Sequence, residues 1–241
     1  TSGNNNLAIG HLAGSAINSG AYNVCIGSYA GDNIDTLSSN VAVGGYALSG
    51  DTLSAGNTAI GYSALNNQNV ASANNVAVGY QAALNLSSGK DSVYVGYTAG
   101  GGGAITGADN VAVGKGAALN ITSGNASVYI GKGAVGVGVA TGANNTVIGV
   151  NAALNATGMN HSVVIGSASN NVGVNNAANN VFIGHAAGQD IASGASNVLI
   201  GFDTGKNITT GGFSTCLGAS AGTAATTEVS NTYVGHSAGN V

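Results

Sequence analysis

The chain has 241 residues, with 5% charged residues, no Pro, no Trp and 42 Gly. Its 44% apolar residues exclude an intrinsically disordered chain, which would combine low hydrophobicity with high net charge. A net charge of −4 without a basic run disfavours a nucleic-acid partner, and the lack of an apolar run of about 18 residues disfavours membrane insertion by this chain.

A motif of the form V-x-I/V-G recurs along the whole chain, as in NNVAVGYQAALN (74–85), DNVAVGKGAALN (109–120) and NNTVIGVNAALN (144–155). Ala dominates the position three residues after the Gly. Fourteen tandem repeats without a linker predict one repeat domain over residues 1–241. The motif Gly recurs every 17 or 18 residues and stands, in chain order, at Gly10, Gly27, Gly44, Gly61, Gly79, Gly96, Gly114, Gly131, Gly149, Gly166, Gly184, Gly201, Gly218 and Gly235.

Each repeat predicts a strand that ends in a bend at the Gly, because apolar residues stand three and one positions before it. A repeat of this length has room for two strands of about five residues and two tight turns, but not for a crossover helix. Identical coils then stack so that each strand pairs in parallel with its copies. The expected fold class is all-β, a parallel β-solenoid (β-roll) of about fourteen coils.

The position four residues before the Gly is Asn or Ser in every repeat. Stacked Asn side chains form hydrogen-bond ladders, and Asn tolerates the turn conformations that precede a strand, so we predict a structural role. No metal site is expected, because carboxylates do not recur at a fixed spacing. The ladder residues are Asn6, Asn23, Asn40, Asn57, Asn75, Ser92, Asn110, Ser127, Asn145, Ser162, Asn180, Asn197, Ser214 and Asn231.

The residue two before the Gly is never charged. Strand alternation points it away from the coil's core, so a monomer would expose an apolar stripe, and we predict an oligomer seam. The alternative is a wider coil that turns this face inward. The predicted seam residues are Ala8, Cys25, Ala42, Ala59, Ala77, Tyr94, Ala112, Tyr129, Val147, Val164, Phe182, Leu199, Cys216 and Tyr233.

The units NVAVGYQAALN, NTAIGYSALN, SVVIGSASN and NVFIGHAAG resemble the YadA-like head repeats of trimeric autotransporter adhesins, and similar V-A-I-G repeats occur in phage tail-fibre-like proteins. The resemblance covers all fourteen repeats. It implies a left-handed β-roll, a homotrimer packed through the position two before the Gly, attachment instead of catalysis, and an extracellular location on a cell or virion surface. The coils here are longer than those of the family.

Enzymatic chemistry is not expected, and neither is a cofactor. His11, His185 and His236 share the position after the motif Gly but stand in distant coils, out of hydrogen-bond reach of a common nucleophile or acid. Cys25 and Cys216 are eleven coils apart, far beyond the Cα separation of about 7 Å that a disulfide tolerates.

A candidate ligand ridge follows the residue after the motif Gly in consecutive coils, at Tyr62, Tyr80, Tyr97, Lys115 and Lys132. The rings either simply stack on one another across the strands or present a surface to a glycan or host matrix ligand.

These observations predict a non-enzymatic extracellular fibrous module for attachment or spacing, either an adhesin head or a viral tail-fibre shaft. The alternative is a structural subunit that stacks end to end into an extracellular filament. Ice binding is disfavoured, because Thr does not recur in a continuous column. The lack of polar capping repeats leads us to expect that the natural protein continues past both ends or that its subunits stack.

Overall fold

The computed structural model describes residues 3–50, 53–67, 74–171 and 176–240. Two compact units, Thr1–Ser123 and Gly124–Val241, are each built from the same repeated coil. Within the described residues every element is a three-residue β-strand, one to a repeat, and no helix is present. The prediction of a single domain over residues 1–241 stays a prediction.

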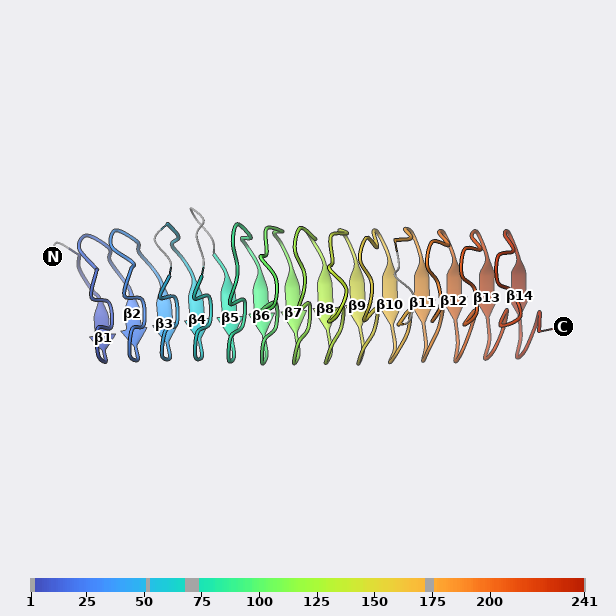
Figure 1. The fold of residues 1–241 in the computed structure, drawn as a ribbon, viewed down its shortest axis with the longest axis horizontal. Coiled ribbons are helices and arrows are strands. Elements are labelled where there is room, and N and C mark those ends of the chain that lie inside the picture. Colours follow the sequence, from blue (N-terminus) through green and yellow to red (C-terminus); the bar gives the residue numbers. More distant parts are fainter. Residues whose placement is uncertain (1–2, 51–52, 68–73, 172–175, 241) are drawn as a thin grey trace. The chain divides into compact units, whose positions relative to one another are not determined.

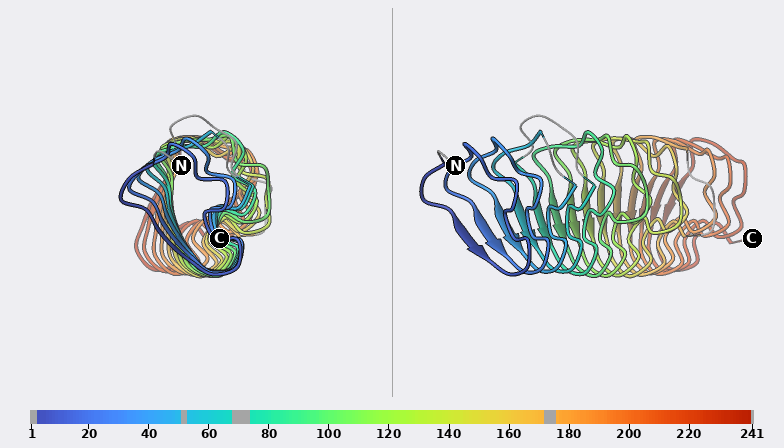
Figure 2. Two further views of the ribbon diagram at one scale, coloured as in Figure 1. Left: turned by 90° about the vertical axis from the view of Figure 1, so that its left-hand side faces the viewer. Right: turned by 60° about the vertical axis from the view of Figure 1, so that its left-hand side comes forward.

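Within each unit, parallel pairing joins each strand to its copy in the next coil (Figure 1). The first unit holds β1 (Leu7–Ile9), β2 (Val24–Ile26), β3 (Val41–Val43), β4 (Thr58–Ile60), β5 (Val76–Val78), β6 (Val93–Val95) and β7 (Val111–Val113), paired in chain order. The second holds β8 (Val128–Ile130), β9 (Thr146–Ile148), β10 (Val163–Ile165), β11 (Val181–Ile183), β12 (Val198–Ile200), β13 (Thr215–Leu217) and β14 (Thr232–Val234), also paired in chain order. The predicted all-β parallel β-solenoid is confirmed, and Figure 2 shows how coils stack within each unit.

The predicted second strand of about five residues is absent from the described coils. Isolated bridge residues stand in its place, as in the parallel bridges Leu86↔Ile105 and Asn160↔Ala178. The reason is that left-handed backbone recurs five before, two after and four after the motif Gly, as at Asn5, Leu12 and Gly14 with φ of 58°, 54° and 56°. Left-handed residues interrupt an extended chain, so each coil keeps one short strand between turns.

The motif Gly is required for two reasons. Its φ lies between 120° and 144° in all fourteen repeats, a region that residues with a Cβ rarely adopt. Coils also approach closely there, because a Cβ on Gly44 would lie 2.6 Å from the carbonyl oxygen of Gly61 in the next coil. A side chain at this position would therefore clash with backbone that cannot move independently.

The predicted orientation of the seam residues is wrong. From Cys25 to Cys216 the residue two before the motif Gly is at most 1% exposed, while Ala8 is exposed and Tyr233 half-buried. These residues are the middle residues of the strands, and each strand turns its middle residue into its own coil. Side chains so buried cannot meet a second chain, and the alternative of an inward-facing position holds. The buried positions are Cys25, Ala42, Ala59, Ala77, Tyr94, Ala112, Tyr129, Val147, Val164, Phe182, Leu199 and Cys216.

Side-chain volume inside a coil is balanced between the middle strand residue and the residue four after the Gly. Where the first is Ala42, the second is Leu48, and both are fully buried. Where the first is Tyr94, the second is Gly100, whose Cβ would collide with the tyrosine ring. Phe182 with Gly188 and Leu199 with Gly205 follow the same rule. In these coils, close packing of a thin core leaves room for one large side chain of the two, whereas the coil of β8 buries both Tyr129 and Val135.

The predicted ladder of Asn and Ser is confirmed. The backbone N–H of Asn40 donates to Asn23 Oδ1 at 3.0 Å, and that of Asn57 donates to Asn40 Oδ1 at 2.9 Å. Ser92 replaces an amide, because its Oγ accepts from the N–H of Asn110 at 3.0 Å. The second unit repeats the pattern, for example from the N–H of Asn197 to Asn180 Oδ1 at 2.8 Å. Each buried side chain thus joins its coil to the next.

Candidate functional site

An aromatic ladder projects from the turns that follow the motif Gly in six successive coils of the first unit. Tyr29 and Tyr46 stack with ring centroids 5.0 Å apart and planes 6° apart. Tyr80 stacks on Tyr62 at 5.6 Å and on Tyr97 at 5.2 Å, with interplanar angles of 12° and 9°. Edge contacts join the rest, at 5.3 Å between His11 and Tyr29 and at 5.9 Å between Tyr46 and Tyr62. The aromatic ladder consists of His11, Tyr29, Tyr46, Tyr62, Tyr80 and Tyr97.

The structure brings together four of the five predicted ridge residues, Tyr62, Tyr80, Tyr97 and Lys115. The Lys115 Nζ lies 5.5 Å from the ring centroid of Tyr97, within the range of a cation–π contact. Lys132 is exposed at the equivalent position but belongs to the second unit.

Sequence reasoning missed Tyr29 and Tyr46, which stand two residues after the Gly instead of one. Both have φ of 58°, and this left-handed turn returns their rings to the column that Tyr62 continues. The edge contact between Tyr46 and Tyr62 falls where the position changes, and there Gly45 leaves space beside the Tyr62 ring. The sequence pattern that identifies the whole ladder is an aromatic residue either one or two positions after the motif Gly.

The ladder tyrosines are partly exposed: Tyr29 is half-buried, and the others range from 39% exposure at Tyr46 to 53% at Tyr97. Their faces lie against neighbouring rings, and Lys115 lies over the last one. A partner molecule would therefore meet mainly ring edges and phenolic hydroxyls. Face-on stacking of a sugar, the usual mode at exposed aromatic rings, is restricted by the ladder itself.

A second repeated surface, here called the outer sheet face, consists of the first and third residues of every strand. They are Val, Ile, Leu or Thr throughout, and they are exposed or half-buried, with Ile9 at 55%, Ile60 at 39% and Leu217 at 48% exposure. Alternation in the sequence shows that a strand has two apolar faces but not which one is inside. This face is the apolar stripe that the sequence analysis assigned to the other set of residues.

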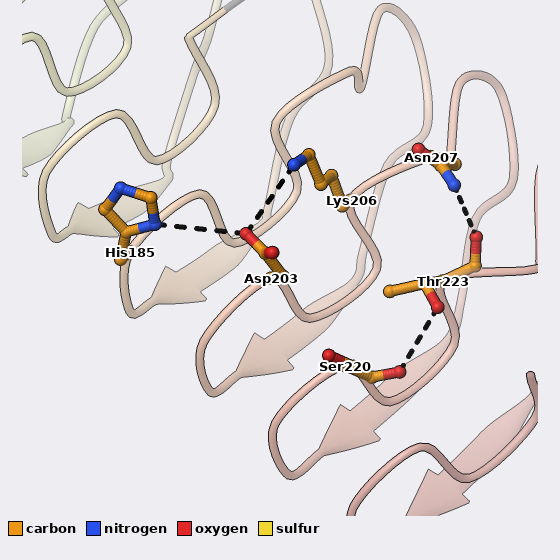
Figure 3. A network of polar contacts seen from close by, with 6 residues as sticks. All are labelled: His185, Asp203, Lys206, Asn207, Ser220 and Thr223. Atoms are coloured by element: carbon orange, nitrogen blue, oxygen red, sulfur yellow. Dashed lines mark hydrogen bonds and ion pairs between the residues drawn. The ribbon is translucent and has the colours of Figure 1, made fainter.

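The second unit carries a small polar cluster (Figure 3). Asp203 Oδ1 lies 3.9 Å from His185 Nδ1 and 3.8 Å from Lys206 Nζ, and the His185 ring stacks on Phe202 at 5.2 Å. Beside it, Asn207 Nδ2 donates to the carbonyl oxygen of Thr223 at 2.8 Å. Partly exposed ion pairs of this kind contribute little stability.

The structure does not bring together, within either unit, the histidines that share the position after the motif Gly. His11 belongs to the first unit, and His185 and His236 stand three coils apart in the second. Nowhere in the described ranges do three His, Cys, Asp or Glu side chains form a group that could hold a metal ion. Cys25 and Cys216 are buried free thiols, and burial raises the pKa of each to about 11, which disfavours the reactive thiolate.

Comparisons of the chain with protein-family models, curated proteins and solved structures gave no match. Among the residues that the structure describes, no helix is long and apolar enough to span a bilayer. The repeated surfaces of the coils are therefore the features from which function can be inferred.

Proposed function

We propose that this chain is a non-enzymatic extracellular module for attachment or spacing in a fibrous surface protein, an adhesin head or a viral tail-fibre shaft. The observation that carries the proposal is the repetition of one kind of side chain, coil after coil, on the outer sheet face and along the aromatic ladder. A repeated surface suits a repetitive partner, such as a second solenoid or a polymer. The resemblance to YadA-like head repeats supports the same function, its surface location and left-handed coils.

The outer sheet face is proposed to pack against copies of this chain, in a homotrimer as the resemblance implies. Monomeric soluble proteins rarely expose large contiguous apolar patches, and this face recurs on every strand. A second copy is the partner whose coils have the same spacing, so that each Val or Ile meets an equivalent residue in every coil. This surface replaces the buried residues that the sequence analysis had assigned to the seam.

Native mass measurement tests this assembly. Replacing Val78 and Val95 with Lys places charges on the outer sheet face of neighbouring strands and should convert trimers to monomers. Replacing the exposed Ser87 and Ser88 with Lys adds the same charge away from that face and should leave the trimer intact. A monomeric wild-type chain would contradict the proposal.

The aromatic ladder is proposed as the ligand ridge of this module, for a surface glycan or host matrix ligand. Its ring edges and phenolic hydroxyls repeat along the coils, and Lys115 adds a positive charge at one end. Replacing Tyr62, Tyr80 and Tyr97 with Ser should abolish attachment to glycan- or matrix-coated surfaces without altering the fold. The matched control is Tyr22→Ser, which removes a tyrosine that is 65% exposed and outside the ladder. Attachment that survives the triple change would contradict the ligand role.

An end-to-end filament subunit is the alternative function. The Asn ladder favours it, because each coil offers side-chain oxygens to the next coil and backbone N–H groups to the preceding one. Because acceptors face one end of a solenoid and donors face the other, the opposite ends of two solenoids are complementary in a head-to-tail contact. Electron microscopy separates the two functions: short separate rods fit the module, and long unbranched fibres fit the filament.

A further inference from the structure

We propose that neighbouring tyrosines of the aromatic ladder form dityrosine cross-links between successive coils when a one-electron oxidant, such as a peroxidase with hydrogen peroxide, acts on the protein. The ladder places five phenols in five consecutive coils, with stacked pairs at Tyr29/Tyr46, Tyr62/Tyr80 and Tyr80/Tyr97. This modification does not require the ladder to bind a ligand, so it goes beyond the proposed attachment.

Geometry favours coupling within the stacked pairs. Their centroids are 5.0 to 5.6 Å apart, and their planes differ by at most 12°. Parallel pairing of β4 with β5 and of β5 with β6 holds the backbones of neighbouring ladder coils at the strand spacing of about 4.8 Å. Each ring is carried on a turn and can rotate about its Cβ–Cγ bond to bring ring edges together.

Four of the five ladder tyrosines are exposed to solvent, and Tyr29 is half-buried. Tyr46, Tyr62, Tyr80 and Tyr97 are 39% to 53% exposed, so that a diffusing oxidant reaches them. Tyr94 and Tyr129 also stand in the first and second units, respectively, but are at most 1% exposed. Tyr22 is the most exposed of these tyrosines, but it projects from another part of the coil, five residues before the motif Gly.

The reaction balances as a two-electron oxidation. The oxidant removes one electron and the phenolic proton from each of two neighbouring tyrosines, which leaves two tyrosyl radicals. The radicals form a bond between the ring carbons ortho to their oxygens. Each of these carbons then loses its hydrogen as a proton, and each oxygen regains one. The net change is the loss of two protons and two electrons, and the oxidant accepts the electrons.

The consequence is a covalent link between adjacent coils. Between the described coils of each unit the contacts are otherwise non-covalent, since both cysteines are free thiols, and each cross-link would close a loop of one repeat. Closing such a loop restricts the unfolded chain in the way that a disulfide does. A fibrous protein under tension would then resist the unzipping of successive coils.

The experiment is photo-oxidation of the dilute chain with tris(bipyridine)ruthenium(II) and persulfate, followed by dityrosine fluorescence and mass spectrometry of elastase peptides. Tyr46→Phe with Tyr80→Phe keeps every ring but leaves no two neighbouring phenols. Tyr22→Phe with Tyr97→Phe removes the same number of phenols and retains two stacked pairs. Because proximity makes the coupling intramolecular, yield should fall about tenfold in the first variant and less than about twofold in the second.

Cross-linked peptides that join Tyr29 to Tyr46, or Tyr80 to a neighbour, are the expected products. Equal yields from the two double variants would overturn the proposal. So would cross-links that mainly involve Tyr22 or mainly join two chains with a yield that rises with protein concentration. Thermal unfolding followed by circular dichroism checks that both variants keep the fold, which Phe favours because it preserves the stacked rings.

Discussion

The ring of Tyr94 occupies the space that a side chain on Gly100 would need. Both residues belong to one coil, and a Cβ at position 100 would collide with two ring carbons. In the coil of β3 the arrangement is reversed, with Ala42 facing a position that holds Leu48. The two positions therefore share one volume, and a change at one should be compensated by a change at the other.

Exchanging the large and the small side chain between positions 94 and 100 tests this relationship. Gly100→Leu alone overpacks the coil and should destabilise by about 3 kcal/mol, and Tyr94→Ala alone leaves a cavity and should cost about 4 kcal/mol. The double variant recreates the Ala42 and Leu48 pair and should recover most of the loss. A double-mutant cycle from urea unfolding measures the coupling, and additive losses would show that the two positions do not share a volume.

Replacement by Ala should destabilise the chain much more at the motif Gly than at the residue after it. Gly44→Ala places a Cβ 2.6 Å from the carbonyl oxygen of Gly61 at φ 129°, and we expect a loss of more than about 3 kcal/mol. Gly45→Ala is the matched control, because its Cβ would only touch the Tyr62 ring at 3.4 Å, and it should cost less than about 1 kcal/mol. Similar midpoints in chemical denaturation for the two variants would refute the close approach of the coils.

The sequence predicts the period, the parallel stacking and the Asn ladder, because each of these follows from one residue type that recurs at one position. The orientation of the strand could not be predicted in the same way. Alternation around Ala42 defines two faces, and left-handed turns outside the strand decide which one is buried. Tyr46 was missed for a related reason, since a left-handed turn moves its ring into the column of Tyr62.

Removing one amide from the Asn ladder should destabilise the first unit. Asn40 is fully buried, and its Oδ1 accepts from the N–H of Asn57 while its Nδ2 donates to the Ser54 carbonyl oxygen at 3.4 Å. Asn40→Ala leaves the N–H of Asn57 without its acceptor and should lower the free energy of unfolding by about 2 kcal/mol. Asn40→Ser should cost less, because Ser92 serves the same N–H contact in another coil. Thermal unfolding compares the two variants, and equal losses would show that the hydroxyl does not replace the amide.

The buried thiols predict a loss of stability at alkaline pH. Burial raises the pKa of Cys25 and of Cys216 from 9.0 to about 11, so the folded chain holds each thiol proton more tightly than the unfolded chain does. Each thiol's contribution is therefore fully present below pH 9 and is lost as the pH rises through about 11. A shift of this size corresponds to about 3 kcal/mol for each thiol.

Tyrosine and lysine side chains also titrate in this range, so the measurement must isolate the thiols. Cys25→Ala with Cys216→Ala removes both and leaves the other groups unchanged. Urea unfolding at pH 8 and at pH 10.5 should show a smaller loss with rising pH in this variant than in the wild-type chain, because only the wild-type chain carries the buried thiols. Equal losses would mean that the thiols ionise at their ordinary pKa in the folded chain, which would contradict their burial inside the coils.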